Sequence, residues 1–358
     1  MRRRPHVLLA RQDSAGDVLL AGPAVRAVAA AAGRVTFLCG PRGREAAELL
    51  PGVDEVLSWH APWMDAEPAP VTRASMDGLV GELARRRVDQ AAVLTSFHQS
   101  PLPLALLLRM AGVGTVAGIS GDYPGSLLDV RHRLDETRDV HEVERALSLV
   151  ATLGYRLPLR DDGRLAVRPP RWPAAAPPRP PYLVVHPGAS VPARAWAPER
   201  AAALVAALRR RGRRVAVTGS AGERDLTALV AGPPGAGAEV ADLGGRLSLE
   251  GLAAVLAGAE AVVVGNTGPA HLAAAVGTPV VSLFAPTVPA ARWRPWGIPH
   301  VLLGRQDAPC AGSRARSCPV PGHPCLNDVR PEEVIGALEA LGSGGQGRLP
   351  EAKEAARR

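Results

Sequence analysis

The sequence predicts an α/β protein with two doubly wound parallel sheets, and three observations support this prediction. Short valine-rich apolar runs alternate with alanine- and leucine-rich segments of helical length, which is the pattern of parallel strands covered by helices. The length of 358 residues favours two domains. Between two such alternations lies the segment 168–181, in which seven of fourteen residues are proline, so that neither a helix nor a central strand can form there.

The first domain is expected to comprise residues 1–167. Glycines at the ends of several helical segments, such as Gly33, Gly112 and Gly154, mark their C-termini. The expected strands are 6–10, 35–39, 53–57, 91–95 and 116–118, and the expected helices are 18–32, 42–50, 76–87, 102–111 and 141–153. The stretch 122–133 is expected to be a loop.

The second domain is expected to comprise residues 182–341, joined to the first by the semi-rigid linker 168–181. The expected strands are 182–186, 215–218, 239–242, 261–264 and 279–284, and the expected helices are 198–211, 223–230, 249–256, one after residue 268, and 331–341. The tail 342–358 is rich in Gly, Ser and charge and is expected to be disordered. Two such domains predict a central cleft that the carboxyl ends of the strands face.

Charge and composition bear on whether the protein binds nucleic acids or membranes. The chain carries 42 basic and 34 acidic residues, and the charge is spread along its length. No module interleaves basic and aromatic residues, which argues against nucleic-acid binding. There is no apolar run of membrane-spanning length and no signal peptide, so we expect a cytoplasmic monomer, with peripheral contact at the inner face of a membrane left open.

Several familiar phosphate-binding motifs are missing from the sequence. Neither a GxGxxG fingerprint nor a GxxxxGK[ST] loop is present, which argues against an NAD enzyme and a P-loop NTPase. No acidic pair follows a predicted strand, so a metal-dependent phosphate clamp is not expected either. We therefore expect no metal and no cofactor.

The stretch 259–287 carries the strongest candidate site. The strand 261–264 is followed by Gly-Asn-Thr-Gly, and Pro269 then occupies the first turn of a helix that Asn266 or Thr267 can cap. A glycine-bearing turn at a helix N-terminus offers free N–H groups and a favourable dipole to a phosphate. His271 lies in the first helical turn, where it can face the phosphate or serve as a cap or core residue.

Three further strand-end loops hold polar candidates. Asp17 begins the first helix as a catalytic carboxylate or, with Ser14 at capping-box spacing, as part of an N-terminal cap. Ser190 and Arg194 follow the strand 182–186 and form either an anion site or an ordinary surface loop. Glu223 can meet a ribose or simply begin its helix.

A cysteine-bearing segment near the C-terminus is the remaining candidate. Cys310, Cys318, His323 and Cys325 form a permissible zinc set, although their spacing lacks a CxxC pair. The alternative is that they are free or partly paired thiols in a loop beside the cleft.

Four segments together resemble glycosyltransferase family 9, the ADP-heptose:lipopolysaccharide heptosyltransferase family. They are SAGDVLLAGPAVRAV, VVHPGASVPARAWAPERAAAL, VTGSAGERD and LGGRLSLEGLAAVLAGAEAVVVGNTGPAHLAAAVGTPVVSLFAPT, in matching order and spacing. The resemblance implies a GT-B fold, with the nucleotide sugar held mainly by the second domain. It also implies metal-independent, inverting transfer of a sugar such as heptose from a nucleoside diphosphate, ADP being favoured, to the hydroxyl of a glycan, lipid-linked or small-molecule acceptor.

The resemblance also implies roles for single residues. Asp17 matches the family's proposed general base, and Gly268 and His271 match residues at the donor diphosphate. Arg194 stands where the family usually has lysine, and Asn266 where it has aspartate. These departures leave other sugars and nucleotides open, together with two other functions of the same fold: a nucleotide-sugar epimerase or hydrolase, and a non-catalytic sugar-nucleotide-binding protein.

Overall fold

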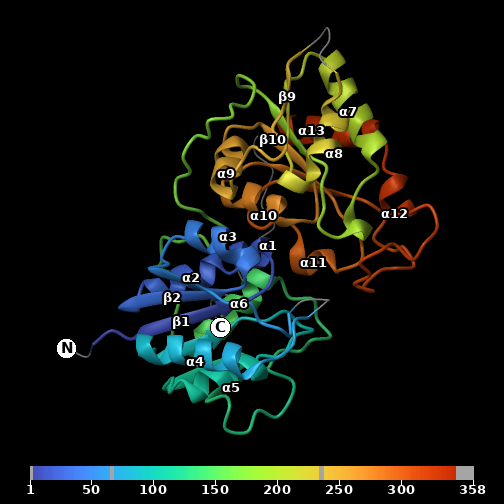
Figure 1. Ribbon diagram of the computed structural model, residues 1–358. Coiled ribbons are helices and arrows are strands. Elements are labelled where there is room, and N and C mark those ends of the chain that lie inside the picture. Colours follow the sequence, from blue (N-terminus) through green and yellow to red (C-terminus); the bar gives the residue numbers. More distant parts are fainter. Residues whose placement is uncertain (1–2, 65–67, 234–237, 344–358) are drawn as a thin grey trace. The chain divides into compact units, whose positions relative to one another are not determined.

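The computed structural model describes residues 3–64, 68–233 and 238–343, so the predicted tail from 344 onward lies outside the described residues. The chain divides into two compact units, one ending at Arg168 and one beginning at Pro169 (Figure 1). The boundary therefore falls at the start of the proline-rich segment. Residues 169–181 contain no helix or strand.

Unit 1, up to Arg168, is built on a parallel sheet with the strand order β3-β2-β1-β4-β5-β6. Its strands are β1 (His6–Arg11), β2 (Arg34–Cys39), β3 (Glu55–Ser58), β4 (Gln90–Val93), β5 (Thr115–Ile119) and β6 (Val130–His132). Its helices are α1 (Ala15–Leu20), α2 (Gly22–Ala29), η1 (Pro41–Gly43), α3 (Arg44–Leu49), α4 (Arg73–Arg86), α5 (Leu102–Met110) and α6 (Glu142–Thr152).

The helices of unit 1 cover both faces of its sheet. Helices α1, α2, α3 and α6 pack together, whereas α4 packs with α5, and Figure 1 shows α1–α3 and α4–α5 on opposite sides of β1 and β2. The central strand β1 is buried along its whole length, as expected for an apolar strand with helices on both sides. It pairs with β2 from His6 opposite Arg34 to Arg11 opposite Cys39.

Unit 2, from Pro169, repeats the same topology with the strand order β12-β11-β10-β7-β8-β9. Its strands are β7 (Leu183–His186), β8 (Val215–Val217), β9 (Val240–Asp242), β10 (Ala261–Gly265), β11 (Val280–Leu283) and β12 (His300–Leu303). Its helices are η2 (Pro192–Arg194), α7 (Pro198–Arg210), η3 (Ala221–Glu223), α8 (Arg224–Ala231), α9 (Leu249–Ala257), α10 (Gly268–Ala275), α11 (Ala290–Trp293), α12 (Pro324–Asn327) and α13 (Pro331–Ser343). Helices α7, α8 and α13 pack together, and α9 packs with α10.

Both sheets therefore have the order 3-2-1-4-5-6 of a dinucleotide-binding fold when their strands are numbered along each unit. The order reverses beside the first strand, between β1 and β4 in unit 1 and between β7 and β10 in unit 2. Loops at such a switch point leave a crevice beyond the carboxyl ends of the strands. The prediction of two Rossmann-like, doubly wound α/β domains is confirmed.

Several predicted elements differ in the structure. The single helix expected over 18–32 is two helices that meet at Ala21, because Pro23 has no N–H to continue the α1 ladder. The loop expected over 122–133 contains β6, a three-residue, half-buried edge strand without a periodic pattern. Thr267 occupies the N-cap position of α10 without a side-chain cap bond, contrary to its predicted capping role. Among the described residues, no helix combines the length and apolar character needed to cross a bilayer.

Candidate functional site

The loop after β1 places Asp17 in the first turn of α1. Ser14 caps this helix, accepting a hydrogen bond from the backbone N of Asp17 at 3.4 Å. The Ser14 hydroxyl also donates to Asp17 Oδ2 at 2.7 Å, and Arg11 Nη2 lies 3.0 Å from Asp17 Oδ1. The cap is therefore present, and it also fixes the Asp17 carboxylate, whose side chain keeps 17% of its surface exposed.

Arg11 lies at the centre of a buried charged cluster that sequence reasoning did not identify as functional. Its side chain is only 4% exposed, and its guanidinium contacts the carboxylates of Asp13 (2.7 Å), Asp17 (3.0 Å) and Glu142 (3.0 Å). Arg11 Nη2 also donates to Ser96 Oγ at 2.6 Å. The only signal in the sequence is a charged residue at the end of a strand that is otherwise apolar.

The cluster shifts the titration of its members. Burial raises the pKa of Asp13 to about 6, although Arg11 acts in the opposite direction. Burial also raises the pKa of Glu142, again against the effect of Arg11. Burial alone would lower the pKa of Arg11, but the carboxylates of Asp13, Glu142 and Asp17 outweigh it and raise the pKa. The guanidinium thus stays charged and three carboxylates share it.

A cavity of about 320 Å³ lies beside this cluster within unit 1. This volume is within the range of small-molecule sites. Asp13 belongs both to the cavity wall and to the Arg11 cluster. The lining residues are Gln12, Asp13, Gly40, Pro41, Arg42, His60, Ala61 and Met64. The cavity therefore combines a carboxylate, two basic side chains and an apolar floor.

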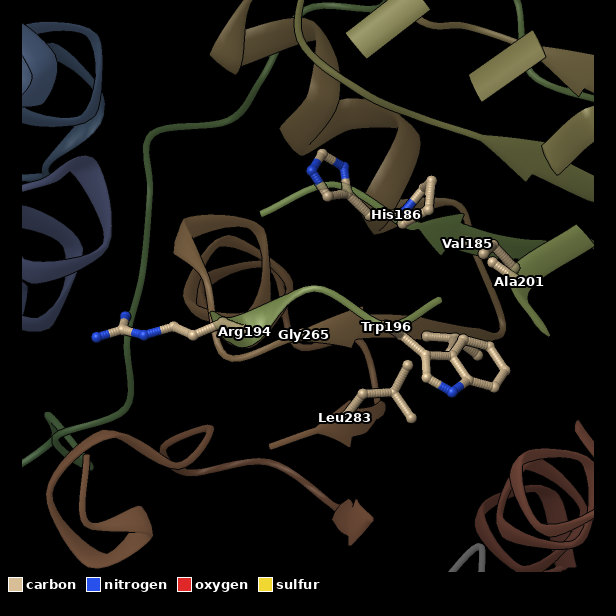
Figure 2. Close-up of a pocket in the computed structure, with 9 residues that line it drawn as sticks. Val185, His186, Arg194, Trp196, Ala201, Gly265 and Leu283 are labelled. Atoms are coloured by element: carbon tan, nitrogen blue, oxygen red, sulfur yellow. The ribbon is translucent and has the colours of Figure 1, made fainter. Parts of the chain in front are cut away.

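In unit 2, the loop after β7 lies against the end of β10. A Cβ added to Gly265 would lie 3.1 Å from the carbonyl oxygen of Arg194, so the loop packs closely there because residue 265 is glycine. Ser190 is exposed and Arg194 is half-buried. Figure 2 shows the Arg194 side chain extending away from the Trp196 ring, which packs beside Leu283. The cavity between these residues measures only about 10 Å³, room for at most one water, so a nucleotide does not fit inside it.

The turn after β10 presents the second group of predicted residues. Asn266 is 6% exposed, and its Oδ1 accepts from the backbone N of Ala285 at 3.4 Å. Its Nδ2 is buried and has no hydrogen-bond partner among the described residues. Gly268 begins α10, and His271 is buried in its first turn. A buried donor beside a helix N-terminus is a plausible contact for an anion.

Glu223 follows β8, the strand next to β7, and its side chain lies against the loop after β7. It closes a capping box, accepting at Oε2 from Ser220 N at 2.7 Å and from Ser220 Oγ at 2.8 Å. A Cβ on Gly188 would overlap the Glu223 carboxylate, so the two segments are in close contact. Burial lowers the pKa of His186, and Glu223 opposes this shift. Glu223 thus both begins its helix and borders the predicted donor loop.

The thiols of the cysteine-bearing segment are neighbours in the structure. Cys310 and Cys325 are buried in the apolar core of unit 2, Cys318 is half-buried, and all three are free thiols. Burial raises the pKa of Cys325 to about 11, and the neighbouring Cys310 and Cys318 thiols act in the same direction. Within the described ranges, no group of three or more His, Cys, Asp or Glu side chains is arranged to hold a metal. The zinc set of Cys310, Cys318, His323 and Cys325 therefore stays a prediction that this arrangement does not support.

Comparisons with known proteins agree with this architecture. Residues 80–323 match the model of glycosyltransferase family 9 (heptosyltransferase), a range that contains the phosphate- and ribose-binding candidates of unit 2 but begins after Asp17. The chain is 33% identical over 326 residues to lipopolysaccharide heptosyltransferase 1 of Pseudomonas aeruginosa, and the alignment covers 87% of each protein.

Two solved structures are similar over nearly their whole length. ADP-heptose lps heptosyltransferase II of E. coli superposes with a TM-score of 0.70 at 21% identity, covering 96% of this chain and 100% of the other. An E. coli heptosyltransferase with ADP-2-deoxy-2-fluoro heptose superposes with a TM-score of 0.69 at 23% identity, covering 93% and 99%. At these identities the two structures show a common fold, which is the GT-B fold expected from the sequence.

Proposed function

This chain belongs to glycosyltransferase family 9 and is therefore a glycosyltransferase, and we propose that it transfers a heptose from ADP-heptose to an acceptor hydroxyl. The heptose and the ADP are suggested by the names of its relatives and by the ADP-heptose analogue in a structural neighbour. The single observation that carries the chemistry is the Asp17 carboxylate, which Arg11 and Ser14 hold at the carboxyl end of β1 while part of it stays exposed.

The donor binds to unit 2 in this proposal. Arg194, with Ser190 on the same loop, contacts the diphosphate, and the N-terminus of α10 offers the N–H groups around Gly268 to it. Asn266, Thr267 and His271 complete the contacts of this turn. Glu223 binds the ribose, because a carboxylate accepts hydrogen bonds from hydroxyl groups.

The reaction is a displacement with inversion at the anomeric carbon. Asp17 accepts the proton of the acceptor hydroxyl while the oxygen of that hydroxyl forms a bond to the anomeric carbon. The bond from the anomeric carbon to the diphosphate oxygen breaks at the same time, and both of its electrons leave with ADP. Arg194 and the α10 N–H groups stabilise the charge on the departing ADP, so we propose that no metal is needed for this step. The acceptor sugar occupies the cavity beside Asp13, where Arg42 and His60 favour an anionic or polyhydroxylated group.

The four free cysteines suit a reducing compartment, so we place the reaction in the cytoplasm, with the acceptor a glycan that is free or lipid-linked. Contact with the inner face of a membrane would then bring a lipid-linked acceptor to the protein.

The proposal is tested by measuring ADP release from ADP-heptose, with and without heptose-deficient lipopolysaccharide as acceptor. A parallel thermal-shift series compares ADP-, GDP-, UDP- and dTDP-sugars at one concentration, because at equal concentration the ligand with the higher affinity raises the melting temperature more. We expect the largest shift with ADP-heptose and acceptor-dependent release of ADP. A larger shift with another nucleotide sugar would contradict the donor, and no shift with any of them would contradict nucleotide-sugar transfer.

A further inference from the structure

We propose that Arg11 is the positioning residue of the catalytic base: its guanidinium holds the Asp17 carboxylate in one orientation and keeps it ionised for proton transfer. This inference rests on the proposed function, because it takes Asp17 to be the base. Arg11 itself contacts no reacting atom and acts through Asp17.

The geometry around Arg11 is that of a fixed anchor. Arg11 is the last residue of β1, and its Nη2 bonds both Asp17 Oδ1 (3.0 Å) and Ser96 Oγ (2.6 Å). Ser96 is itself held, since its backbone N donates to Gln99 Oε1 at 2.9 Å. The nitrogen of Arg11 that contacts Asp17 is thus also hydrogen-bonded to the segment after β4, and β4 itself pairs with β1.

Glu142 fixes the opposite side of the guanidinium. Its side chain is 1% exposed, its Oε2 lies 3.0 Å from Arg11 Nη1, and it accepts from Ser96 Oγ at 3.1 Å. Glu142 is the first residue of α6, where the helix dipole favours an acidic side chain. Three elements far apart in the sequence therefore converge on one buried arginine, which leaves the guanidinium little freedom to rotate.

The charge balance of the cluster explains why the cation matters to Asp17. One guanidinium faces three carboxylates, those of Asp13, Asp17 and Glu142, so the cluster already carries excess negative charge when all of them are ionised. Removing the cation would leave the ionised Asp17 beside two buried acids without the guanidinium that all three contact, although Arg145 would still act on Glu142. A like charge disfavours ionisation, so Asp17 would then stay protonated to higher pH.

Other charged groups surround α1 and bear on its titration. Helix α1 packs against η1, α2, α3 and α6. The charged or titratable residues on these elements and at their caps are Arg26, Arg42, Arg44, Glu45, Glu48, His141, Glu142, Glu144 and Arg145. Several are engaged elsewhere: Arg26 with Asp161, Arg44 with Glu48, and Arg145 with Glu136. For Asp17 and its two neighbouring acids, Arg11 is the shared cation.

A purely structural role explains the cluster less well. Burying an arginine with several acids costs desolvation energy that close contacts barely return, and apolar residues of similar size often stabilise a fold as well or better. A held and ionised base, in contrast, requires a fixed cation at this position. The same arrangement would be retained for function even at a cost in stability.

The test measures acceptor-dependent ADP release from ADP-heptose by Arg11→Met, Asp17→Asn and the double variant. We expect Arg11→Met to lower kcat on the order of 100-fold, as misplacement of a reacting group by about 1 Å does, with the KM for ADP-heptose unchanged. The acidic limb of its kcat/KM profile should move up by at least about one pH unit. In the Asp17→Asn background, adding Arg11→Met should lower the residual rate less than about 3-fold, because a residue that acts through Asp17 has nothing left to act on.

Arg26→Met is the matched control. Arg26 lies on α2, which packs against α1, but it forms its ion pair with Asp161, at 2.6 and 2.8 Å, instead of with Asp17. We expect it to lower stability while leaving the pH profile in place. If Arg11→Met shows the same profile as Arg26→Met, or lowers the rate equally with and without the Asp17 carboxylate, Arg11 does not position the base.

Two further results separate this inference from the proposed function. If the wild-type protein releases no ADP, the proposed function and this inference both fail; if Asp17→Asn alone retains full activity, the assignment of the base and this inference fail together. Should Arg11→Met not fold, Arg11→Lys replaces it, with an expected loss of about 10-fold in kcat and an acidic limb within about half a unit of wild type, because the charge remains but the planar fork is lost. An Arg11→Lys variant with wild-type kcat would overturn the inference.

Discussion

The two units have the same sheet topology, but the polar groups at their switch points are arranged in opposite ways. In unit 1, Arg11 forms ion pairs with three carboxylates inside the protein, although Arg11 Nε, Asp13 Oδ2 and Glu142 Oε1 make no hydrogen bond among the described residues. In unit 2, the turn after β10 has no such ion pairs among the described residues, and it leaves the neutral donor Asn266 Nδ2 without a partner beside the N-terminus of α10. A buried arginine that pairs with several carboxylates suits a base that must be held still. An open donor at a helix N-terminus suits a ligand that brings its own negative charge.

The largest effect expected from this comparison is on the stability of unit 1. Because the pKa of Asp13 is raised from 3.8 to about 6 in the folded protein, the folded state binds a proton that the unfolded state has already lost. The contribution of this bound proton to the free energy of unfolding is complete below pH 3.8 and is lost as the pH rises through 6. Asp13→Asn mimics the protonated form, so it should stabilise the protein at pH 7 by up to about 3 kcal/mol and leave stability unchanged below pH 4.

Chemical denaturation at pH 4 and pH 7 measures this difference. Asp161→Asn is a control of opposite sign, since the hydrogen bond from Arg26 lowers the pKa of Asp161. The Asp161 variant should lose stability at pH 7 and recover relative to wild type as the pH falls through the folded pKa. An Asp13→Asn protein less stable than wild type at pH 7 would show that Arg11 outweighs burial at this carboxylate.

The next largest effect concerns the donor loop of unit 2. Arg194→Ala should raise the Kd for ADP about 30-fold, or about 2 kcal/mol, because it removes a charged hydrogen bond to the diphosphate. Isothermal titration calorimetry measures the Kd for ADP directly. Arg213→Ala, which breaks a solvent-exposed pair with Glu260 in the same unit, should leave the Kd unchanged. Equal affinities of both variants would remove Arg194 from the donor site.

A smaller effect is expected at Asn266. If its unpartnered amide donates to the bound donor, Asn266→Ala should weaken ADP-heptose binding by about 1 kcal/mol, or about 5-fold. The melting temperature of the unliganded protein is measured alongside and should fall modestly, because the bond from Ala285 N to Asn266 Oδ1 is lost. Titration with ADP and with ADP-heptose shows which part of the donor the amide contacts, and unchanged affinity for both would contradict the contact.

The smallest effect distinguishes two helix N-termini of unit 2. Ser248 caps α9 by accepting from Gly251 N at 3.1 Å, so Ser248→Ala should cost about 1 kcal/mol of unfolding free energy. Thr267 makes no such bond at α10, and Thr267→Ala should cost only a few tenths of a kcal/mol. A loss at Thr267 equal to that at Ser248 would mean that the α10 terminus is closed by its own side chain.

The sequence predicted the repeated α/β pattern well because buried parallel strands are short, continuous apolar runs such as β1 and β10. It missed β6, which carries no such run, and β12, in which only 301–303 are apolar; both strands are half-buried throughout. Within the candidate site, local spacing pointed to Asp17 and the turn around Gly268, whose functional roles stay predictions. It could not identify the Arg11 cluster, because Ser96 lies 85 residues from Arg11 and is brought to it only by the pairing of β1 with β4.

The division of roles between the two units is tested most directly by comparing Asp17→Asn with wild type for turnover and for ADP binding. The substitution keeps the shape of the side chain and removes the charge that, in the proposed mechanism, accepts the proton of the acceptor hydroxyl. We predict that kcat for ADP release falls about 1000-fold, while the Kd for ADP changes less than 2-fold. A variant that keeps its kcat, or that loses ADP binding along with turnover, would contradict the assignment of the base to unit 1 and of the donor to unit 2.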